Sequence, residues 1–533
     1  MTNLKESLLD DLLAKLESVR IWSPRVISKL ETLIRSGDDY SLFRLNPIQF
    51  ATEKGIAETE AIDLFLHSTK LGLFEMEWHL ICAMCGNYVE SFRHMHKLHS
   101  TYVCKECAYE NNATLDDYIQ VAFTISRSVR EIAFHHPESL SADDLFFKYN
   151  LCRGARSWWE GWEHEQLFRH VTQFLDYLEP GNLRRLDFPT ELGFIILANV
   201  TAKATLGLLV GAEAASEVQT ISTQIVDGKP YIMDIPTAPP RIDLGYIVFS
   251  FDELSHLKTG RLILHVENRM DRRACIWIAH FKGTPPRKLL TFDPFLSGKR
   301  LITTQTFRDL FRTETVSADE GIGVKDITFL FTDLKGSTAL YDQIGDPKAY
   351  FLVRQHFDTL GHVIQRYEGA TIKTIGDAVM ATFLTPLDAV RAALEMLRDI
   401  EAFNQNISDK LVLKIGIHTG HSIVVTLNDR LDYFGQTVNI ASRIQGLADA
   451  GDIYISEDVY TFPGVQEAIA HCTTSAEQVT VKGVSETINV YKITASPGEP
   501  SDSPCQDSLE SSSASAADQE KSVEPQPDPS RGS

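Results

Sequence analysis

The chain has 533 residues, of which 43% are hydrophobic and 23% are charged, and its formal net charge is −21. This is the composition of a globular protein large enough for several domains. The acidic excess argues against nucleic acid or an anionic membrane as the main partner, because phosphate binding needs clustered Lys and Arg. Eight cysteines are too few for a disulfide scaffold. The first residues are acidic and amphipathic, unlike a signal peptide, and no uncharged apolar run reaches bilayer length, so we expect a cytoplasmic protein without a transmembrane segment.

The N-terminal residues 1–78 predict a helical module. Leucines recur every four residues from Leu4 to Leu16 over fewer than three heptads, which favours a helix packed on its own domain over a dimer-forming coil. Residues 46–74 then read as helix, turn at Gly55 and helix, the outline of a winged-helix-like unit. The second of these helices opens with acidic residues, which would repel phosphate, so we expect it to pack against protein rather than bind DNA.

Residues 79–115 contain two C-x-x-C pairs separated by eighteen residues, Cys82/Cys85 and Cys104/Cys107. This spacing is typical of a zinc ribbon, in which each pair points two thiolates at one tetrahedral ion. The alternative is four free thiols. Histidines between the pairs are alternative ligands, although we expect them on the surface of the connecting hairpin. Four protein ligands close the site, so we predict one structural Zn²⁺ per chain with no catalytic role.

Residues 116–318 predict a β-rich, sandwich-like region. Its apolar segments are short, rich in β-branched and aromatic residues, and bounded by turn residues. The expected strands cover residues 118–125, 184–189, 194–201, 246–251, 261–268 and 274–281. The proline-containing stretch from Val226 to Leu244 predicts a linker or long loop. At the other end of the chain, residues 496–533 are Ser-, Pro- and acid-rich and predict a disordered tail.

Residues 319–495 differ in kind from the rest. A strand ending in Asp333, a helix over 347–367, two strands joined at Gly376-Asp377, a helix over 386–403 and a further strand follow one another. The order β-α-β-β-α-β is the ferredoxin-like arrangement. The whole chain is thus expected to be a multi-domain α+β protein.

Two aspartates of this segment predict a metal site. On such a sheet the end of the first strand and the tip of the neighbouring hairpin lie side by side, which would bring Asp333 and Asp377 together. Mg²⁺ is commonly bound by one or two carboxylates plus substrate phosphates, so the pair could hold two divalent ions. The backbone amides of the following turn, which includes Gly336, Ser337 and Thr338, can cradle phosphates.

Four sequence motifs of this segment carry a resemblance. FTDLKGST, IKTIGDAVMA, GIHTG and DYFGQTVNIASR, in this order, resemble the catalytic domain of the class III nucleotide cyclases, the family of adenylyl and guanylyl cyclases. The match covers about a third of the chain. The upstream part resembles an uncharacterised region that precedes such cyclases in bacterial proteins.

The resemblance implies roles for individual residues. Asp333 and Asp377 correspond to the two metal-binding aspartates, which would hold two Mg²⁺ or Mn²⁺ per active site. Lys373 and Asp432 occupy the positions that read the purine. A lysine ammonium can donate to adenine N1 and a carboxylate can accept from its N6, so this pair favours ATP. Lys482 corresponds to the lysine that holds the terminal phosphates.

Asn439 and Arg443 correspond to the family's transition-state pair. They are four residues apart in a segment that reads as a helix, so both side chains leave one face. The resemblance implies conversion of ATP to 3′,5′-cyclic AMP and pyrophosphate at sites shared by two subunits, and hence a homodimer. Two alternatives stay open: a cyclase that makes cGMP, cUMP or cCMP, and an inactive nucleotide-sensing regulator.

Overall fold

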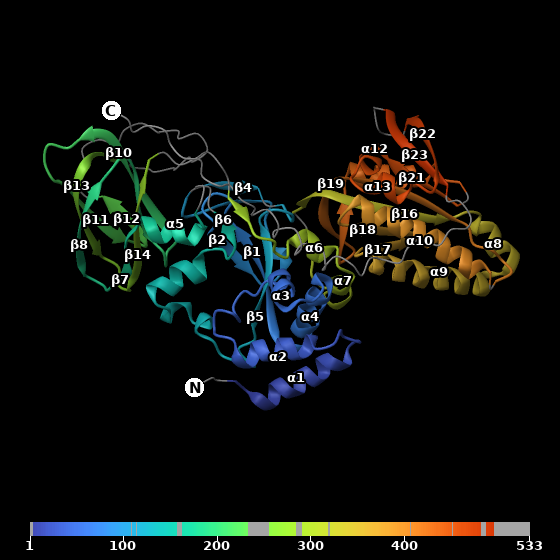
Figure 1. Ribbon diagram of the computed structural model, residues 1–533, viewed down its shortest axis with the longest axis horizontal. Helices are drawn as coiled ribbons and strands as arrows, with labels where there is room; N and C mark the ends of the chain where they lie inside the picture. The colour runs from blue at the N-terminus through green and yellow to red at the C-terminus, as the bar shows by residue number, and fades with distance from the viewer. Residues whose placement is uncertain are drawn as a thin grey trace, which may run out of the picture.

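The computed structural model describes residues 4–107, 109–112, 114–156, 162–232, 255–283, 290–317, 320–405, 407–449, 451–480 and 487–494. The expected strand over 246–251 and the expected disordered tail lie outside these residues. Three units follow one another along the long axis, with a β-rich unit at one end, a helical unit in the middle and a C-terminal α/β unit at the other end (Figure 1). Among the helices of the described residues, none has both the length and the apolar character needed to cross a bilayer.

Four helices build the first part of the middle unit: α1 (Glu6–Ser18), α2 (Val26–Ser36), α3 (Pro47–Lys54) and α4 (Glu58–Leu71). The leucine stripe of α1 is buried within this unit, as expected for a helix that packs on its own domain. Helix α3 begins where the Asn46 side chain accepts a hydrogen bond from the Ile48 amide. Gly55 and Gly72 adopt the left-handed conformation that ends α3 and α4.

A three-stranded antiparallel sheet completes the middle unit. Its order is β2-β1-β5, with β1 (Phe74–Ile81), β2 (Tyr88–Phe92) and β5 (Ile119–Ile125). The short hairpin of β3 (Thr101–Val103) and β4 (Glu110–Asn112) lies in the insert between β2 and β5. Strand β5 was expected with the later strands, but it pairs with β1. This pairing joins residues 39 to 51 positions apart, which strand-like composition alone does not reveal.

The β-rich unit consists of two sheets that share one long strand, β13. Its apolar side chains from both sheets enclose a common core, which includes Leu197 and Ile276 from one sheet and Ile221 and Leu264 from the other. The strands are β7 (Thr172–Leu178), β8 (Leu183–Thr190), β9 (Gly193–Asn199), β10 (Ala204–Ala214), β11 (Gln219–Val226), β12 (Lys229–Ile232), β13 (Ser255–Asn268) and β14 (Ala274–Lys282).

The prediction of a linker or loop from Val226 to Leu244 is wrong at its beginning. Strand β12 pairs there with β11 through a two-residue turn at Asp227 and Gly228, both with positive φ. Asp-Gly is a strong hairpin signal, which the prolines farther along the segment obscured. The rest of the predicted loop, from residue 233 onward, lies outside the described residues.

Short elements connect the β-rich unit with the two others. Helix α5 (His164–Val171) packs on β14, and β6 (Ala155–Arg156) pairs with β15 (Thr291–Phe292). Helices α6 (Gly298–Ile302) and α7 (Gln305–Leu310) then lie between the middle unit and the C-terminal unit (Figure 1).

The C-terminal unit follows the predicted β-α-β-β-α-β order. Its main strands lie in the order β17-β18-β16-β19-β21-β23-β22, and each of the first four is antiparallel to its neighbour among them. The strands are β16 (Ile322–Leu334), β17 (Ala370–Ile375), β18 (Ala378–Phe383), β19 (Leu413–Leu427), β20 (Arg430–Phe434), β21 (Asp452–Ser456), β22 (Thr473–Thr480) and β23 (Thr487–Thr494). The helices are α8 (Ser337–Ile344), α9 (Asp346–Arg366), α10 (Pro386–Asn404), α11 (Gln436–Gln445), α12 (Glu457–Tyr460) and α13 (Val465–Ala468).

The two faces of this sheet have different neighbours. Helices α9 and α10 cover one face, where Leu330 and Leu334 of β16 join their core (Figure 1). On the opposite face, which we call the open face, Phe329 and Phe331 join a second core that continues into the middle unit. Helix α11 also packs on the open face through Ala441.

Candidate active site

Asp333 and Asp377 lie at adjoining ends of two paired strands. β16 pairs with β18 up to Thr332 opposite Val379, so Asp333 directly follows the paired part of β16 while Asp377 directly precedes β18. The Leu334 amide donates a hydrogen bond to Asp377 Oδ2 (3.3 Å), which holds this carboxylate beside Asp333. Alternation along β16 places Asp333 on the open face, because it shares the parity of Phe329 and Phe331.

The two carboxylates suit a divalent cation. Both side chains are half-buried, and Asp333 Oδ2 already attracts a cation, the Lys414 ammonium at 2.6 Å. Each aspartate keeps one carboxylate oxygen without a hydrogen-bond partner among the described residues. Two carboxylates supplemented by phosphate oxygens are the ligand set that Mg²⁺ and Mn²⁺ accept. The residues therefore fit the expected metals. Beneath them, burial lowers the pKa of His356, against the opposing effect of the Asp377 charge.

The turn after β16 supplies the predicted backbone amides. Gly336 has φ +74° and directly precedes α8, so the amides of Ser337 and its neighbours stand at a helix N-terminus, where anions are favoured. Thr338 lies on the same helix, and its side chain is outside the described residues.

Lys373 and Asp432 are brought together as an ion pair. Lys373 comes from β17 and Asp432 from β20, and the Lys373 ammonium contacts Asp432 Oδ2 although 59 residues separate them. The second carboxylate oxygen, Oδ1, accepts the Tyr433 amide at 2.8 Å. The Asp432 side chain is only 10% exposed, so its orientation is fixed by these two contacts.

Asn439 and Arg443 leave the outer face of α11. Ile440 and Ala441, which point toward the sheet, are buried, whereas Asn439 is exposed and Arg443 is half-buried. Neither side chain has a hydrogen-bond or ion-pair partner within the described ranges. They are therefore free to bind an external group.

The glycine of GIHTG that begins the motif sets the position of α11. A Cβ atom on Gly416 would lie 2.2 Å from the backbone nitrogen of Gln445, so only glycine lets the helix approach β19 this closely. The predicted phosphate-binding Lys482 lies outside the described residues.

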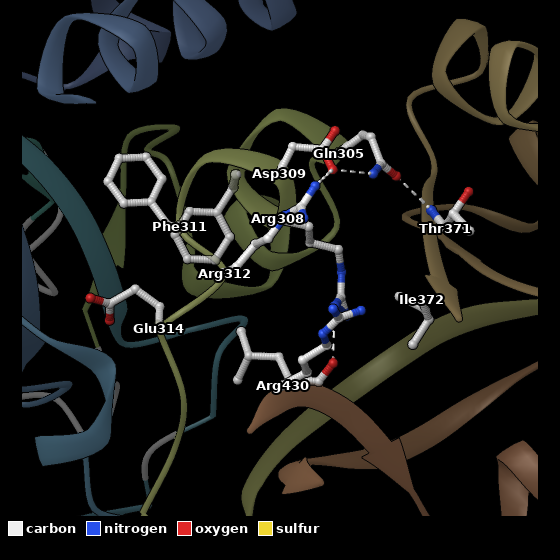
Figure 2. Close-up of a pocket in the computed structure, with 11 residues that line it drawn as sticks. Gln305, Arg308, Asp309, Phe311, Arg312, Glu314, Thr371, Ile372 and Arg430 are labelled. Carbon is white, nitrogen blue, oxygen red and sulfur yellow. Dashed lines mark hydrogen bonds and ion pairs between the residues drawn. The ribbon is translucent and has the colours of Figure 1, made fainter. Parts of the chain in front are cut away.

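Sequence reasoning missed the contacts that reach this site from α7. Arg308 donates from Nη1 to the Leu431 carbonyl (3.0 Å), directly before Asp432, and Gln305 Oε1 accepts the Thr371 amide (2.8 Å), two residues before Lys373. These side chains line a cavity of about 170 Å³ between α7 and strands β17 and β20 (Figure 2). No local pattern signals them, because the partners are more than sixty residues apart in sequence.

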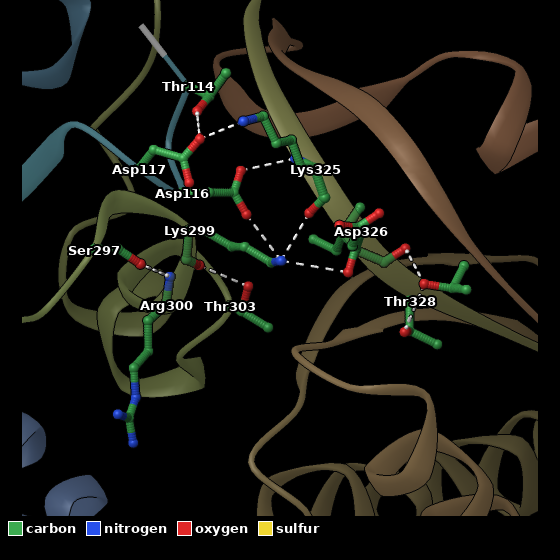
Figure 3. Close-up of polar contacts among 12 residues, drawn as sticks. Thr114, Asp116, Asp117, Ser297, Lys299, Arg300, Thr303, Lys325, Asp326 and Thr328 are labelled. Carbon is green, nitrogen blue, oxygen red and sulfur yellow. Dashed lines mark hydrogen bonds and ion pairs between the residues drawn. The ribbon is translucent and has the colours of Figure 1, made fainter. Parts of the chain in front are cut away.

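A second contact ties the beginning of β16 to the middle unit. Asp116 accepts the Lys325 amide (2.7 Å) and pairs with the Lys299 ammonium (2.9 Å), which also donates to the Lys325 carbonyl (2.7 Å) (Figure 3). Asp117 adds an ion pair with the Lys325 side chain. Asp116 and Lys299 are 13% and 14% exposed, so this pair is largely shielded from water.

The four predicted zinc ligands form a compact cluster in the middle unit. All four Sγ atoms lie within 4.8 Å of one another, with Cys82–Cys107 at 3.5 Å and Cys85–Cys104 at 3.6 Å. A tetrahedral Zn²⁺ with bonds of about 2.3 Å requires sulfurs about 3.8 Å apart, so the cluster fits the ion. His164 donates from Nε2 to the Cys85 carbonyl (2.9 Å), and burial lowers its pKa to about 4, which keeps the ring neutral.

The histidines between the cysteine pairs lie outside this cluster, as expected. His94 is exposed and contacts Glu314 (2.8 Å), which precedes β16, and His99 lies near Glu320 (3.5 Å). The zinc-ribbon-like insert therefore contacts the segment that leads into the C-terminal unit.

Comparison with known proteins finds relatives of two parts of the chain. Residues 322–495 match the adenylate and guanylate cyclase catalytic domain, and residues 9–244 match a family of unknown function, DUF5939. An adenylate cyclase of Lachancea kluyveri is 30% identical over 154 residues, which cover 25% of this chain and 8% of that protein. An adenylate cyclase of Anabaena cylindrica is 29% identical over 185 residues, which cover 32% and 37%. The chain thus spans well under half the length of these relatives.

Among solved structures, the adenylyl cyclase CyaB of P. aeruginosa is 26% identical and aligns over 33% of this chain and 97% of its own, with a TM-score of 0.30. The C-terminal third of the chain is a class III nucleotide cyclase catalytic domain. In this protein the domain follows an N-terminal region of the DUF5939 family, to which no function is attached.

Proposed function

We propose that the protein converts ATP to 3′,5′-cyclic AMP and pyrophosphate at a site shared by two copies of the chain. The observation that carries the choice of ATP is the Lys373–Asp432 pair, whose members meet from two strands. An ammonium donates to adenine N1 and a carboxylate accepts from the N6 amino group, whereas guanine presents the reverse pattern at both atoms. For ATP to bind, the ion pair between Lys373 and Asp432 has to break, so that both side chains can form hydrogen bonds with the adenine instead.

The reaction needs positioning and charge stabilisation rather than a side-chain nucleophile. The ribose 3′-oxygen attacks the α-phosphorus, its proton passes to solvent, and the bond to the bridging oxygen of pyrophosphate breaks. Arg443 stabilises the charge that develops on the α-phosphate, and Asn439 orients the ribose. Two Mg²⁺ or Mn²⁺ at Asp333 and Asp377 would lower the pKa of the 3′-hydroxyl and neutralise the triphosphate.

The surface around these residues supports a homodimer. Ile423 and Phe434 are cross-strand neighbours in the β19–β20 hairpin, and they are 38% and 63% exposed. Ile375, which adjoins the hairpin tip that carries Asp377, is 52% exposed. Apolar side chains gathered around a polar site favour coverage by a partner.

The first test is product analysis of the purified chain with ATP, GTP, UTP and CTP, each with Mg²⁺ or Mn²⁺. Cyclic AMP that disappears in an Asp377→Ala variant supports the proposal. Another cyclic nucleotide retains the mechanism and refutes the reading of Lys373 and Asp432. Nucleotide binding without any product favours an inactive nucleotide sensor.

Mixing variants tests the shared site. Asp377→Ala and Arg443→Ala chains are each expected to be inactive, but their heterodimer has one site with both lesions and one site with neither. Activity should therefore return on mixing. The absence of any rescue, with heterodimers verified by differential tagging, contradicts the shared-site arrangement.

We further infer that the four-cysteine cluster holds one structural Zn²⁺ per chain. Its sulfur separations support this inference, and metal analysis of the purified protein tests it.

A further inference from the structure

A cavity of about 610 Å³ lies on the middle unit, away from the cyclase domain's catalytic residues. Its floor is the face of the β2-β1-β5 sheet that carries Glu75, Glu77 and Thr124. The alternate residues of β1, such as Phe74, pack against α4 on the other face. A sheet face that carries polar side chains beneath a cavity is typical of a ligand site rather than of a core.

Arg44 is the unusual residue of this cavity. It is only 8% exposed, yet no carboxylate within the described residues lies within 4.0 Å of its guanidinium. Its Nη1 donates to the Tyr149 carbonyl (2.5 Å), while Nε is buried without a partner. Burying an uncompensated charge costs several kcal/mol in general, so such a group calls for a counter-charge.

Aromatic rings hold the guanidinium in place. Its central carbon lies 4.6 Å from the Phe43 ring centroid, 4.3 Å from that of Tyr88 and 4.8 Å from that of Tyr149. These contacts orient the charge by cation–π attraction but do not neutralise it. Arg44 also has φ +45°, and non-glycine residues in this strained region are concentrated at functional sites.

The remaining charges around the cavity leave an excess of positive charge. Four basic side chains (Arg44, Arg93, Arg127 and Lys203) and two acidic ones (Glu75 and Glu77) line it, in a chain whose net charge is −21. Arg93 is paired with Glu75 at 2.7 Å, whereas Lys203 donates to the Tyr88 and Val89 carbonyls of β2 and has no ion pair within 4.0 Å among the described residues. Burial lowers the pKa of Lys203, against the opposing effect of the Glu106 charge. His135 also lines the cavity, and burial lowers its pKa, which disfavours a further positive charge there.

We propose that this cavity binds a small organic oxyanion, a carboxylate or a phosphate ester, whose negative charge is the counter-ion of Arg44. The aromatic walls suit a flat or apolar remainder of the ligand. The cavity is large enough for a metabolite-sized molecule, and the site is independent of whether the cyclase domain turns over ATP.

The test measures thermal unfolding of the full chain against inorganic phosphate and against acetate, with chloride at equal ionic strength as the reference. An Arg443→Ala background removes an arginine that would bind phosphate at the proposed active site. We expect a saturable rise in Tm with at least one anion, and the responding anion identifies the ligand as a phosphate or a carboxylate.

Arg44→Met should raise the apparent Kd for the responding anion at least tenfold. Arg93→Met is the control, because it removes a cation that is already paired with Glu75, and it should change this Kd by less than about twofold. If Arg44→Met does not fold, Lys203→Met serves as the second variant and should also weaken binding. A saturable response that persists in the Arg44 and Lys203 variants, or no saturable response to either anion, overturns the proposal.

Discussion

Substitution of Arg308 by methionine should weaken substrate binding without slowing the chemical step. The change removes the charge-assisted hydrogen bond to the Leu431 carbonyl, worth about 1.5–3 kcal/mol. It also removes a cation over the Tyr433 ring at 5.7 Å, worth about 0.5–1 kcal/mol. Both contacts flank Asp432, which would read the base and not the reacting atoms.

If these contacts fix Asp432, their loss affects the ground state and the transition state equally. The two losses together, about 2–4 kcal/mol, then correspond to a roughly 30- to 900-fold rise in KM for ATP, with kcat changed less than about threefold. Steady-state kinetics with ATP measures both constants. Arg312→Met is the matched control, because Arg312 lines the same cavity but is 67% exposed and pairs only with Asp309 within the described part of the chain.

An unchanged KM in Arg308→Met, with Tm equal to that of the wild type, would refute the reasoning. A fall in kcat at constant KM would also do so, since it would place the effect on the reacting groups. Thermal unfolding of both variants separates these results from general loss of the fold.

Three further predictions concern stability. Asp116→Asn should lower the free energy of unfolding by about 2 kcal/mol or more, because it leaves the largely buried Lys299 ammonium uncompensated. Asp117→Asn removes the more exposed ion pair with Lys325 and should lower it by less than about 1 kcal/mol. Urea denaturation of the two variants measures the difference. Burial lowers the pKa of His418 to about 4, so the unfolded chain binds its extra proton below about pH 6.5. The free energy of unfolding should therefore be highest above about pH 6.5 and fall by up to about 3 kcal/mol as the pH approaches 4. His418→Gln should remove this part of the pH dependence, which urea denaturation at several pH values measures. Cys104→Ser should reduce the bound zinc below one per chain and lower Tm, whereas Cys472→Ser, outside the cluster, should change neither.

The parts predicted correctly from the sequence depend on short-range chemistry. Two C-x-x-C pairs lead to one sulfur cluster because each knuckle is a local turn. The hairpin at Gly376-Asp377 and the helix that carries Asn439 and Arg443 likewise follow from local signals. The proximity of Asp333 and Asp377 could be predicted because the β-α-β-β-α-β order places their two strands next to each other.

The parts missed depend on contacts between distant segments. The pairing of β5 with β1, the contacts of Arg308 with β20 and the burial of Arg44 among aromatic rings involve partners brought together only by the tertiary fold. A buried arginine has the same one-letter code as a solvated one, so composition and periodicity cannot distinguish them. The boundaries proposed at residues 78, 115, 318 and 495 stay predictions.

The core that passes from the middle unit onto the open face affects how the catalytic domain can be studied. Ile322, Val324, Val424 and Leu431 belong to the same buried cluster as α1 and β1. A fragment that starts near residue 320 would turn these side chains toward water, next to the surface where a second copy is proposed to dock. The self-association, solubility and basal turnover of such a fragment would then reflect a newly made apolar surface, and only the full chain gives a valid reference for them.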